Sequence, residues 1–340
     1  MKHPPAAANS YPMNGIAHIG EIMKGHGATC APEEFHALVN VTFHKFESEV
    51  YDELHRDMWE SLPEQFQLLV DDYLRKAPES RDSLRVLDVG CGTGLASDCL
   101  LKTELGRRIG SIDLLDTSPS MLYRASQRAK SWNRPFRCLE GLLGSVRGPT
   151  LYDIVVSCSV LHHIPDIPAF LRTMQSLQAQ NGIFIHMQDP NGDFLADPEL
   201  NARMKKADEE LSPGTRRFTP RRVFSRLYRE ITGKQRKDYI VRTNRELLEK
   251  GIIKNRLSVP EIFSITDIHV HDGHGVSILQ LRELLPDYEL ISRRSYGFMG
   301  RLAYSLPEQL KRIERREIAA HAPNGFHLGA VWMRRFNRID

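Results

Sequence analysis

The sequence lacks the paired cysteines that mark a disulfide framework or a structural zinc site. Its 340 residues contain five cysteines, an odd number, and none of them forms a Cys-x-x-Cys pair. No apolar run approaches the ~20 residues that span a bilayer, and the N-terminal residues contain no apolar segment of signal-peptide length. We therefore expect reduced thiols and a cytoplasmic protein without a membrane anchor.

The sequence also lacks a large excess of positive or negative charge. The 46 Lys and Arg residues face 43 Asp and Glu residues, for a net charge of +3, which does not indicate a nucleic-acid-binding protein. The exception is local: residues 203–250 hold fifteen Lys and Arg against seven Asp and Glu. With 41% hydrophobic and 26% charged residues, the composition is that of an ordinary globular protein.

Helical spacing dominates the N-terminal quarter of the chain. Residues 1–30 are rich in Pro, Gly, Ala and His, and we expect a mobile arm there. From Pro32 to Lys76, apolar residues recur every three or four positions, which predicts amphipathic helices. We interpret Phe43, Phe46 and Trp59 as core residues of this region.

Short apolar runs then alternate with helical patterns, and this rhythm predicts parallel βαβ units. The predicted strands are residues 84–89, 108–115, 136–139, 152–158, 182–187, 288–293 and 326–333. The predicted helices are residues 95–105, 119–130, 167–178, 278–285 and 307–317. The fold class is thus α/β: a doubly wound, mostly parallel seven-stranded sheet of Rossmann-like type.

Four regions follow from this pattern. Residues 1–78 form the arm and a helical cap, and residues 79–190 form the Rossmann-like core. Residues 191–265 form a basic helical lid inserted after the fifth strand, and residues 266–340 complete the core sheet. We find no internal repeat.

The loop after the first predicted strand carries three alternate glycines. It reads Asp88-Val89-Gly90-Cys91-Gly92-Thr93-Gly94. Glycines permit positive φ angles and let a ligand approach the backbone, and the next helix offers free N–H groups at its start. The spacing differs from the G-x-G-x-x-G of dinucleotide enzymes, so this loop predicts another cofactor at the carboxyl ends of the strands.

The loop resembles motif I of the class I S-adenosylmethionine (SAM)-dependent methyltransferases. Residues 152–157 and 161–166 resemble that family's fourth strand and the segment that follows it, and residues 179–184 resemble its turn into strand five. The resemblance covers residues 80–190 closely and the last strands loosely. It implies a Rossmann-like fold and SAM as the cofactor, and it says little about the substrate.

The resemblance also implies the residues that contact the cofactor. Besides Asp88 and Gly90 to Gly94, it assigns the ribose hydroxyls to Asp116, in a D-x-S-x-x-M pattern that ends at Met121, and the methionine ammonium group to carbonyls of Ser157 and Cys158. Leu142 stands where the family often has an adenine-binding Asp, so we expect Leu142 to pack on the purine. The implied set is Asp88, Gly90, Cys91, Gly92, Thr93, Gly94, Asp116, Thr117, Met121, Gly141, Leu142, Ser157 and Cys158.

Four residues are candidates for chemistry. His162 and His163 follow the fourth strand, and an imidazole can take a proton from a nucleophile as a methyl group moves; we favour His163, beside Ile164-Pro165. Asp189 could orient or deprotonate a substrate, or be only a turn residue before Pro190. Tyr51 resembles a cap tyrosine that donates to the SAM carboxylate, or is a half-buried helix residue.

Two further motifs remain. His269, His271 and His274 lie with two aspartates in residues 267–274, where we read His269 and His271 on one face of a strand and favour a structural or substrate-loop role. We predict no metal site. The six arginines of residues 216–229 belong to the lid and favour a carboxylate- or phosphate-bearing substrate.

The leading hypothesis for function is methyl transfer from SAM to a small molecule. One alternative breaks a different bond of SAM, either by cyclisation to azetidine-2-carboxylate and methylthioadenosine or by aminocarboxypropyl transfer. Another is a SAM-binding protein without catalysis. The sequence does not name the acceptor, its nucleophilic atom or the oligomeric state.

Overall fold

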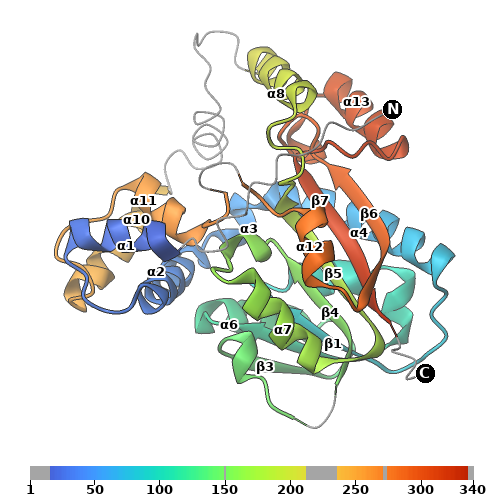
Figure 1. The fold of residues 1–340 in the computed structure, drawn as a ribbon, viewed down its shortest axis with the longest axis horizontal. Helices are drawn as coiled ribbons and strands as arrows, with labels where there is room; N and C mark the ends of the chain where they lie inside the picture. Colours follow the sequence, from blue (N-terminus) through green and yellow to red (C-terminus); the bar gives the residue numbers. More distant parts are fainter. Residues whose placement is uncertain (1–15, 149–150, 212–235, 271–273, 336–340) are drawn as a thin grey trace.

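The computed structural model describes residues 16–148, 151–211, 236–270 and 274–335. Its centre is a seven-stranded sheet with the strand order β3-β2-β1-β4-β5-β7-β6 (Figure 1). Strands β1 to β5 pair in parallel, whereas β7 runs antiparallel to both β5 and β6. The strands are β1 Leu84–Val89, β2 Ile109–Asp116, β3 Phe136–Glu140, β4 Tyr152–Cys158, β5 Gln178–Pro190, β6 Tyr288–Tyr296 and β7 His327–Arg334.

The helices are α1 Ile16–His26, α2 Pro32–Glu47, α3 Tyr51–Leu54, α4 Arg56–Lys76, α5 Leu95–Leu101, α6 Pro119–Ala129, α7 Ile167–Leu177, α8 Pro198–Leu211, α10 Arg236–Glu249, α11 Val259–Thr266, α12 Ile278–Leu284 and α13 Glu308–Ala319. Short 3₁₀ helices are η1 Glu104–Arg108, η2 Leu143–Ser145, η3 Leu161–His163 and η5 Ala303–Ser305. Among the described residues, no helix is long and apolar enough to cross a membrane.

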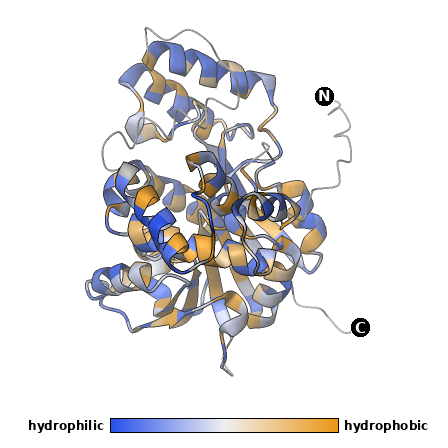
Figure 2. Cartoon of the chain, turned by 90° about the vertical axis from the view of Figure 1, so that its left-hand side faces the viewer, coloured by the Kyte–Doolittle hydropathy of each residue, from blue (hydrophilic) through white to orange (hydrophobic). Residues whose placement is uncertain are grey.

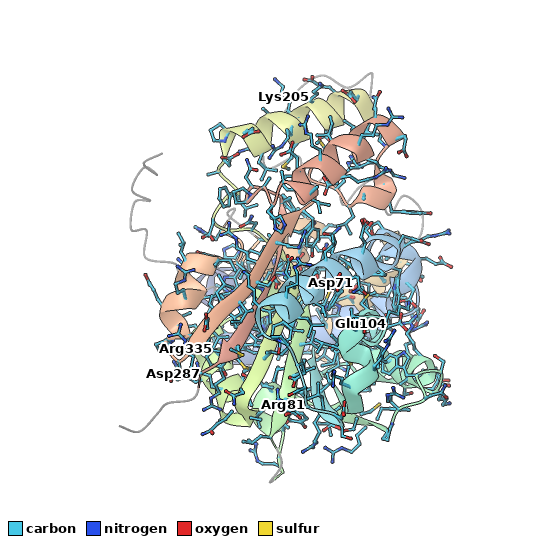
Figure 3. The ribbon with its side chains drawn as sticks, turned by 90° about the vertical axis from the view of Figure 1, so that its right-hand side faces the viewer. Asp71, Arg81, Glu104, Lys205, Asp287 and Arg335 are labelled. Atoms are coloured by element: carbon cyan, nitrogen blue, oxygen red, sulfur yellow. The ribbon has the colours of Figure 1, made fainter. Side chains whose placement is uncertain are left out.

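Helices cover both faces of the sheet, which explains why its strands are apolar along most of their length. On β1, Val86 packs into the core shared with α4, α5, α6 and α13, while its neighbour Leu87 packs into the core shared with α7 and α12. Charged side chains such as Glu104, Lys205 and Asp287 lie on the outside of the molecule (Figure 3). The sheet thus provides a rigid frame whose loops are free to build a site.

The strand order reverses between β1 and β4, because β2 follows on one side of β1 and β4 lies on the other. In open α/β sheets a ligand binds outside the carboxyl ends of the strands at such a switch point. Both the glycine-rich loop and the segment after β4 start there. The predicted fold class is confirmed, and the seven predicted strands overlap the observed ones.

Two local predictions were wrong. Residues 16–26 are not a mobile arm but form α1, because Ile19 and Met23 are buried in an apolar cluster with α2, α10 and α11. The predicted helix of residues 95–105 ends at Leu101 and is followed by η1. Residues 1–15 lie outside the described part of the chain.

The apolar cluster that buries α1 contains residues from before β1 and residues from after β5. Helices α1 and α2 precede the sheet, whereas α10 and α11 follow β5, and the four lie together beside the strand ends (Figure 1). Figure 2 shows hydrophobic and hydrophilic residues alternating along the helices, as expected of helices with one buried face. We call these four helices with α3 the cap.

Candidate functional site

The glycine-rich loop has the backbone conformation that its glycines were expected to permit. Gly90, Gly92 and Gly94 have φ angles of 62°, 52° and 92°. A Cβ on Gly90 would lie 2.7 Å from Val160, so this position is closed by packing. A Cβ on Gly92 would meet nothing within 4 Å, so this position faces open space, as a loop that cradles a ligand requires.

Asp116, at the end of β2, holds the loop in place. Its carboxylate accepts hydrogen bonds from the backbone N–H of Gly92 (2.9 Å) and of Ser118 (2.8 Å). Burial raises the pKa of Asp116, against these hydrogen bonds. The helix α6 is capped separately, by the Ser118 hydroxyl, which accepts from the N–H of Met121. Asp116 therefore fixes the conformation of the glycine loop from the end of the neighbouring strand, and its contact with a ribose stays a prediction.

Asp88 lies beneath the loop. It is fully buried, and one carboxylate oxygen accepts from both the N–H (3.1 Å) and the hydroxyl (2.6 Å) of Ser97 on α5. Burial raises its pKa to about 7. The other oxygen is buried with no hydrogen-bond partner among the described residues, as is the hydroxyl of Ser157 at the end of β4. Unmatched buried polar atoms near the switch point fit a site that a polar ligand completes.

A group of hydrogen bonds around Asp52, which we call the clamp, links the cap to the same loop. Asp52 on α3 accepts from the Thr93 hydroxyl (2.7 Å), the indole N–H of Trp59 (3.1 Å) and the Arg128 guanidinium (2.6 Å). Arg128 also donates to the Thr93 carbonyl and stacks over the Trp59 ring at 3.9 Å. The cap and the glycine loop are thus tied together through the residue between two glycines.

The predicted adenine position is open. Gly141 has a φ of 136° and donates its N–H to the Asp116 carbonyl (3.0 Å), and Leu142 is 66% exposed. A large apolar side chain left exposed beside the loop suits the face of a purine. Thr117 is half-buried next to Asp116, and Cys91 and Met121 are buried. The contacts of these residues with a cofactor stay predictions.

Two non-glycine residues with positive φ stand side by side at the ends of β4 and β5. Ser159 has a φ of 61° and Gln188 a φ of 64°, and the Ser159 N–H donates to the Met187 carbonyl. Such conformations cost free energy and cluster at functional sites. Both residues line a cavity of about 200 Å³ between the strand ends and the cap.

The cavity is rich in titratable side chains. His44, Glu47, Tyr51, His55 and Asp57 come from α2, α3 and the start of α4. Asp267 comes from the end of α11, and His162, His163, Arg301 and His327 come from the strands of the sheet and the segments next to them. The three predicted catalytic residues His162, His163 and Tyr51 are therefore brought together. Asp189 is fully buried just behind this wall.

His162 and Asp189 form a buried pair. The Asp189 carboxylate accepts from the His162 Nδ1 (2.8 Å) and from the His162 backbone N–H (3.2 Å). Its other oxygen lies 3.7 Å from His186. Burial alone would raise the pKa of Asp189, but the two histidines hold it well below its usual range. The pair fixes the ring of His162 and leaves its Nε2 lone pair available.

His163 has a different environment. Its Nδ1 lies 2.6 Å from the Thr266 carbonyl, which can only accept, so this nitrogen carries the hydrogen. The Asp267 carboxylate lies 3.2 Å from the same Nδ1 atom. Burial, reinforced by the neighbouring histidines, holds the pKa of His163 well below its usual range, so the ring is neutral at neutral pH.

The opposite wall contains residues that the sequence did not single out. Glu47, which is buried, contacts His44 (3.0 Å) and His55 (3.5 Å). Burial by itself would raise its pKa, but these two histidines lower it to about 2. The ring of Tyr51 lies 4.3 Å from that of His55. Four members of this group, His44, Glu47, Tyr51 and His55, stand three or four positions apart in the sequence. That spacing is typical of any amphipathic helix, so it does not mark these residues as functional.

Of the remaining predictions, the histidine-rich segment is partly wrong. Residues 268–270 form a turn and not a strand, and the Nε2–H of His269 donates to the Ile164 carbonyl (2.6 Å). His271 and the six lid arginines of residues 216–229 lie outside the described residues. Phe43 is in the apolar cluster of the cap as predicted, and it also lines the cavity.

Comparison with known proteins agrees with this geometry. Residues 87–184 match the family model of a methyltransferase domain. The chain is 36% identical over 101 residues to a malonyl-[acyl-carrier protein] O-methyltransferase of Magnetococcus marinus, a match that covers 29% of this chain and 36% of that protein. It is 33% identical over 106 residues to a ubiquinone biosynthesis O-methyltransferase of a Caulobacter species, covering 31% and 40%. The match thus spans well under half the length of either relative.

Solved structures resemble the chain more loosely. The plantazolicin methyltransferase in complex with S-adenosylhomocysteine (SAH) superposes with a TM-score of 0.44 at 12% identity, covering 94% of this chain and 100% of that one. Residues 87–184 thus match a methyltransferase domain, and they lie in a sheet of Rossmann-like strand order. SAM is the cofactor of that domain.

Proposed function

We propose that the protein transfers the methyl group of SAM to an oxygen atom of a small polar molecule held in the cavity. The observation that carries this proposal is the position of His162, which follows β4, has its ring fixed by Asp189 of β5, and lines the cavity between the strand ends and the cap. The names of both curated relatives describe O-methyl transfer, which favours an oxygen nucleophile.

The size of the cavity favours a compact acceptor. Pockets for drug-sized ligands enclose roughly 300–1,000 Å³, whereas this cavity encloses about 200 Å³. The expectation of an anionic acceptor rested on arginines outside the described residues. In the cavity, Arg301 is near Asp208 (3.2 Å), so we limit the proposal to a polar acceptor without assigning its charge.

The chain's own residues would bind, align and shield the reactants. SAM supplies a methyl carbon that is already electrophilic because it is attached to a sulfonium sulfur. The glycine loop and Asp116 would hold the cofactor, and the cap would exclude water from the cavity. His162 presents a lone pair that can assist the acceptor oxygen, and the Asp189 carboxylate stabilises positive charge that develops on the ring.

A single incubation separates this proposal from SAM cyclisation. The purified full chain is mixed with methyl-deuterated SAM, first alone and then with a small-molecule extract, and the products are analysed by mass spectrometry. We expect SAH only when the extract is present, together with a metabolite that gains one deuterated methyl group. Methylthioadenosine formed from SAM alone would establish cyclisation instead. Absence of all products, with SAH bound in calorimetry, would point to a non-catalytic SAM-binding protein.

A further inference from the structure

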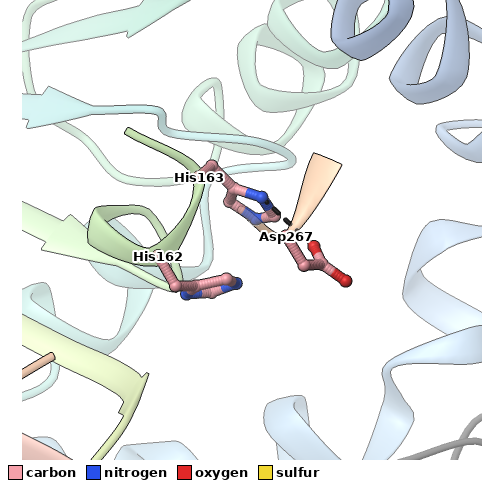
Figure 4. Close-up of side chains that lie close together, drawn as sticks. All are labelled: His162, His163 and Asp267. Carbon is pink, nitrogen blue, oxygen red and sulfur yellow. Dashed lines mark ion pairs between the residues drawn. The ribbon is translucent and has the colours of Figure 1, made fainter. Parts of the chain in front are cut away.

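We propose that His162, His163 and Asp267 form a binding site for a divalent transition-metal ion on the wall of the cavity. Each of the three offers one ligand atom, and these atoms lie within 4.8 Å of one another. All three side chains line the cavity. In Figure 4 the two imidazole rings extend from one segment, and Asp267 approaches them from another.

The two segments are bound to each other independently of any ion. His162 and His163 lie on η3, directly after β4, whereas Asp267 ends α11 about a hundred residues later. The backbone N–H of His269 donates to the His162 carbonyl (3.0 Å), and the His269 ring contacts the Ile164 carbonyl (2.6 Å). The fold therefore holds the two segments that carry the ligands next to each other.

The hydrogen bonds around the rings leave electron pairs for an ion. The Nδ1 atom of His162 faces the Asp189 carboxylate, and the Nδ1 atom of His163 lies 2.6 Å from the Thr266 carbonyl and 3.2 Å from the Asp267 carboxylate. All three partners accept, so each Nδ1 carries the hydrogen and each Nε2 keeps a lone pair. A carboxylate or carbonyl behind the ring is the usual support for a metal-binding histidine, because it fixes the tautomer and the ring orientation.

The donor set indicates which ions fit. Two imidazoles and one carboxylate suit iron, cobalt, nickel or zinc better than magnesium or calcium, which prefer oxygen ligands. Ligand atoms around one such ion lie roughly 3–3.5 Å apart. To close the cluster, the Asp267 carboxylate would turn from the Nδ1 edge of the His163 ring toward its Nε2. Three protein ligands leave coordination positions open toward the cavity, as in catalytic rather than structural sites.

The role of the ion, unlike the site itself, rests on the proposed function. With an ion bound, the His162 lone pair would be used as a ligand, so the ion and not the imidazole would bind the acceptor oxygen and lower its pKa. The acceptor would lose its O–H proton to bulk solvent as it binds, before the cap excludes water; the O–C bond then forms with the methyl carbon, and the C–S bond breaks with its electron pair remaining on sulfur. The products are the methylated acceptor and neutral SAH, and no oxidant or reductant is needed.

Cobalt(II) titration of the untagged full chain tests the site without any acceptor or SAM. After chelator treatment, Co²⁺ is added and its visible d–d absorption recorded, and Zn²⁺ binding is measured by calorimetry. We expect one ion per chain, and binding at least tenfold weaker in Asp267→Asn and in His163→Gln, in line with the loss of a ligand. His55→Gln, a histidine on the opposite wall of the same cavity, is the matched control and should bind normally.

Retained SAH binding shows that each variant is folded. Binding of Co²⁺ that is undetectable in the parent, or unchanged in both ligand variants, would overturn the proposal. Binding lost in His55→Gln but kept in Asp267→Asn would place the ion beside α3 instead, which also contradicts the proposal. Because these readouts need no turnover, the metal site can fail while methyl transfer stands, and the reverse.

Discussion

The contact between Asp52 and the glycine loop gives a graded prediction for cofactor binding. In Asp52→Asn the amide oxygen can still accept from Thr93 and Trp59, but the amide N–H₂ faces the Arg128 guanidinium, so only that link is lost. In Asp52→Ala all three hydrogen bonds are lost. The cap then no longer holds the loop between Gly92 and Gly94 in the conformation that a cofactor requires.

The magnitude follows from exposure. A charge-assisted hydrogen bond contributes about 1.5–3 kcal/mol when buried. The side chains of Asp52 and Arg128 are 41% and 25% exposed, so solvent screening reduces this to about 1 kcal/mol. In Asp52→Asn, the cost of ordering the freed loop on binding is then about 1 kcal/mol, which weakens SAH affinity about fivefold. In Asp52→Ala, which loses all three hydrogen bonds, we expect a cost of about 2 kcal/mol and an affinity roughly thirtyfold weaker.

Calorimetry with SAH measures this effect, since SAH binds without reacting. Glu53→Gln is the matched control: it makes the same change of charge on the same helix, at an exposed residue, and should bind as the parent does. Circular dichroism confirms that the variants are folded. The reasoning is refuted if folded Asp52→Ala binds SAH within twofold of the parent, because the clamp would then have no bearing on the cofactor site.

Three further outcomes follow from the site. Gly92→Ala should lower SAH affinity at least tenfold, since its Cβ enters the open space of the loop, whereas Gly251→Ala, with a similar φ of 68° and equal space at the end of α10, should cost only about 1 kcal/mol of stability and leave binding unchanged. Asp189→Asn should lower the rate of SAH formation in the presence of acceptor extract about 10–100-fold and leave SAH affinity unchanged. A fall in SAH affinity as large as the fall in rate would contradict a role through His162. The pKa of Glu47, about 2 against an ordinary 4.5, means that its ionised form stabilises the fold above pH 4.5 and that this contribution is lost as pH falls toward 2. Thermal melts should therefore show Glu47→Gln destabilised by up to about 3 kcal/mol near pH 7 and converging with the parent in acid; a constant difference would disprove the shift.

The strands and helices of the core could be predicted because the sequence patterns that specify them are local. An apolar run bounded by turn residues predicts a buried strand whatever surrounds it, and the run 152–158 became β4 with the predicted limits. The glycine loop is equally local, since positive φ at Gly92 is a property of one backbone position. In the same way, Ser118 and Asp166 cap α6 and α7 through hydrogen bonds to residues three positions ahead.

The structure of the cap and the residues of the cavity were harder to predict from the sequence because they depend on contacts between distant segments. Ile19 looked like part of a mobile arm, and only its burial against α10 and α11 explains helix α1. Glu47 was not singled out, since its role arises from burial beside two histidines across a helix boundary.

Local patterns in the sequence suffice to predict the sheet, the helices that cover it and the glycine-rich loop, because periodicity and glycine placement act within a few residues. The tertiary structure alone decided which side chains share the cavity. The sequence directed attention to the histidines after Asp267, but folding brings Asp267 itself to His162 and His163, about a hundred residues earlier. Chain connectivity does not encode that proximity; the packing of α11 and the turn after it on the segment that follows β4 creates it.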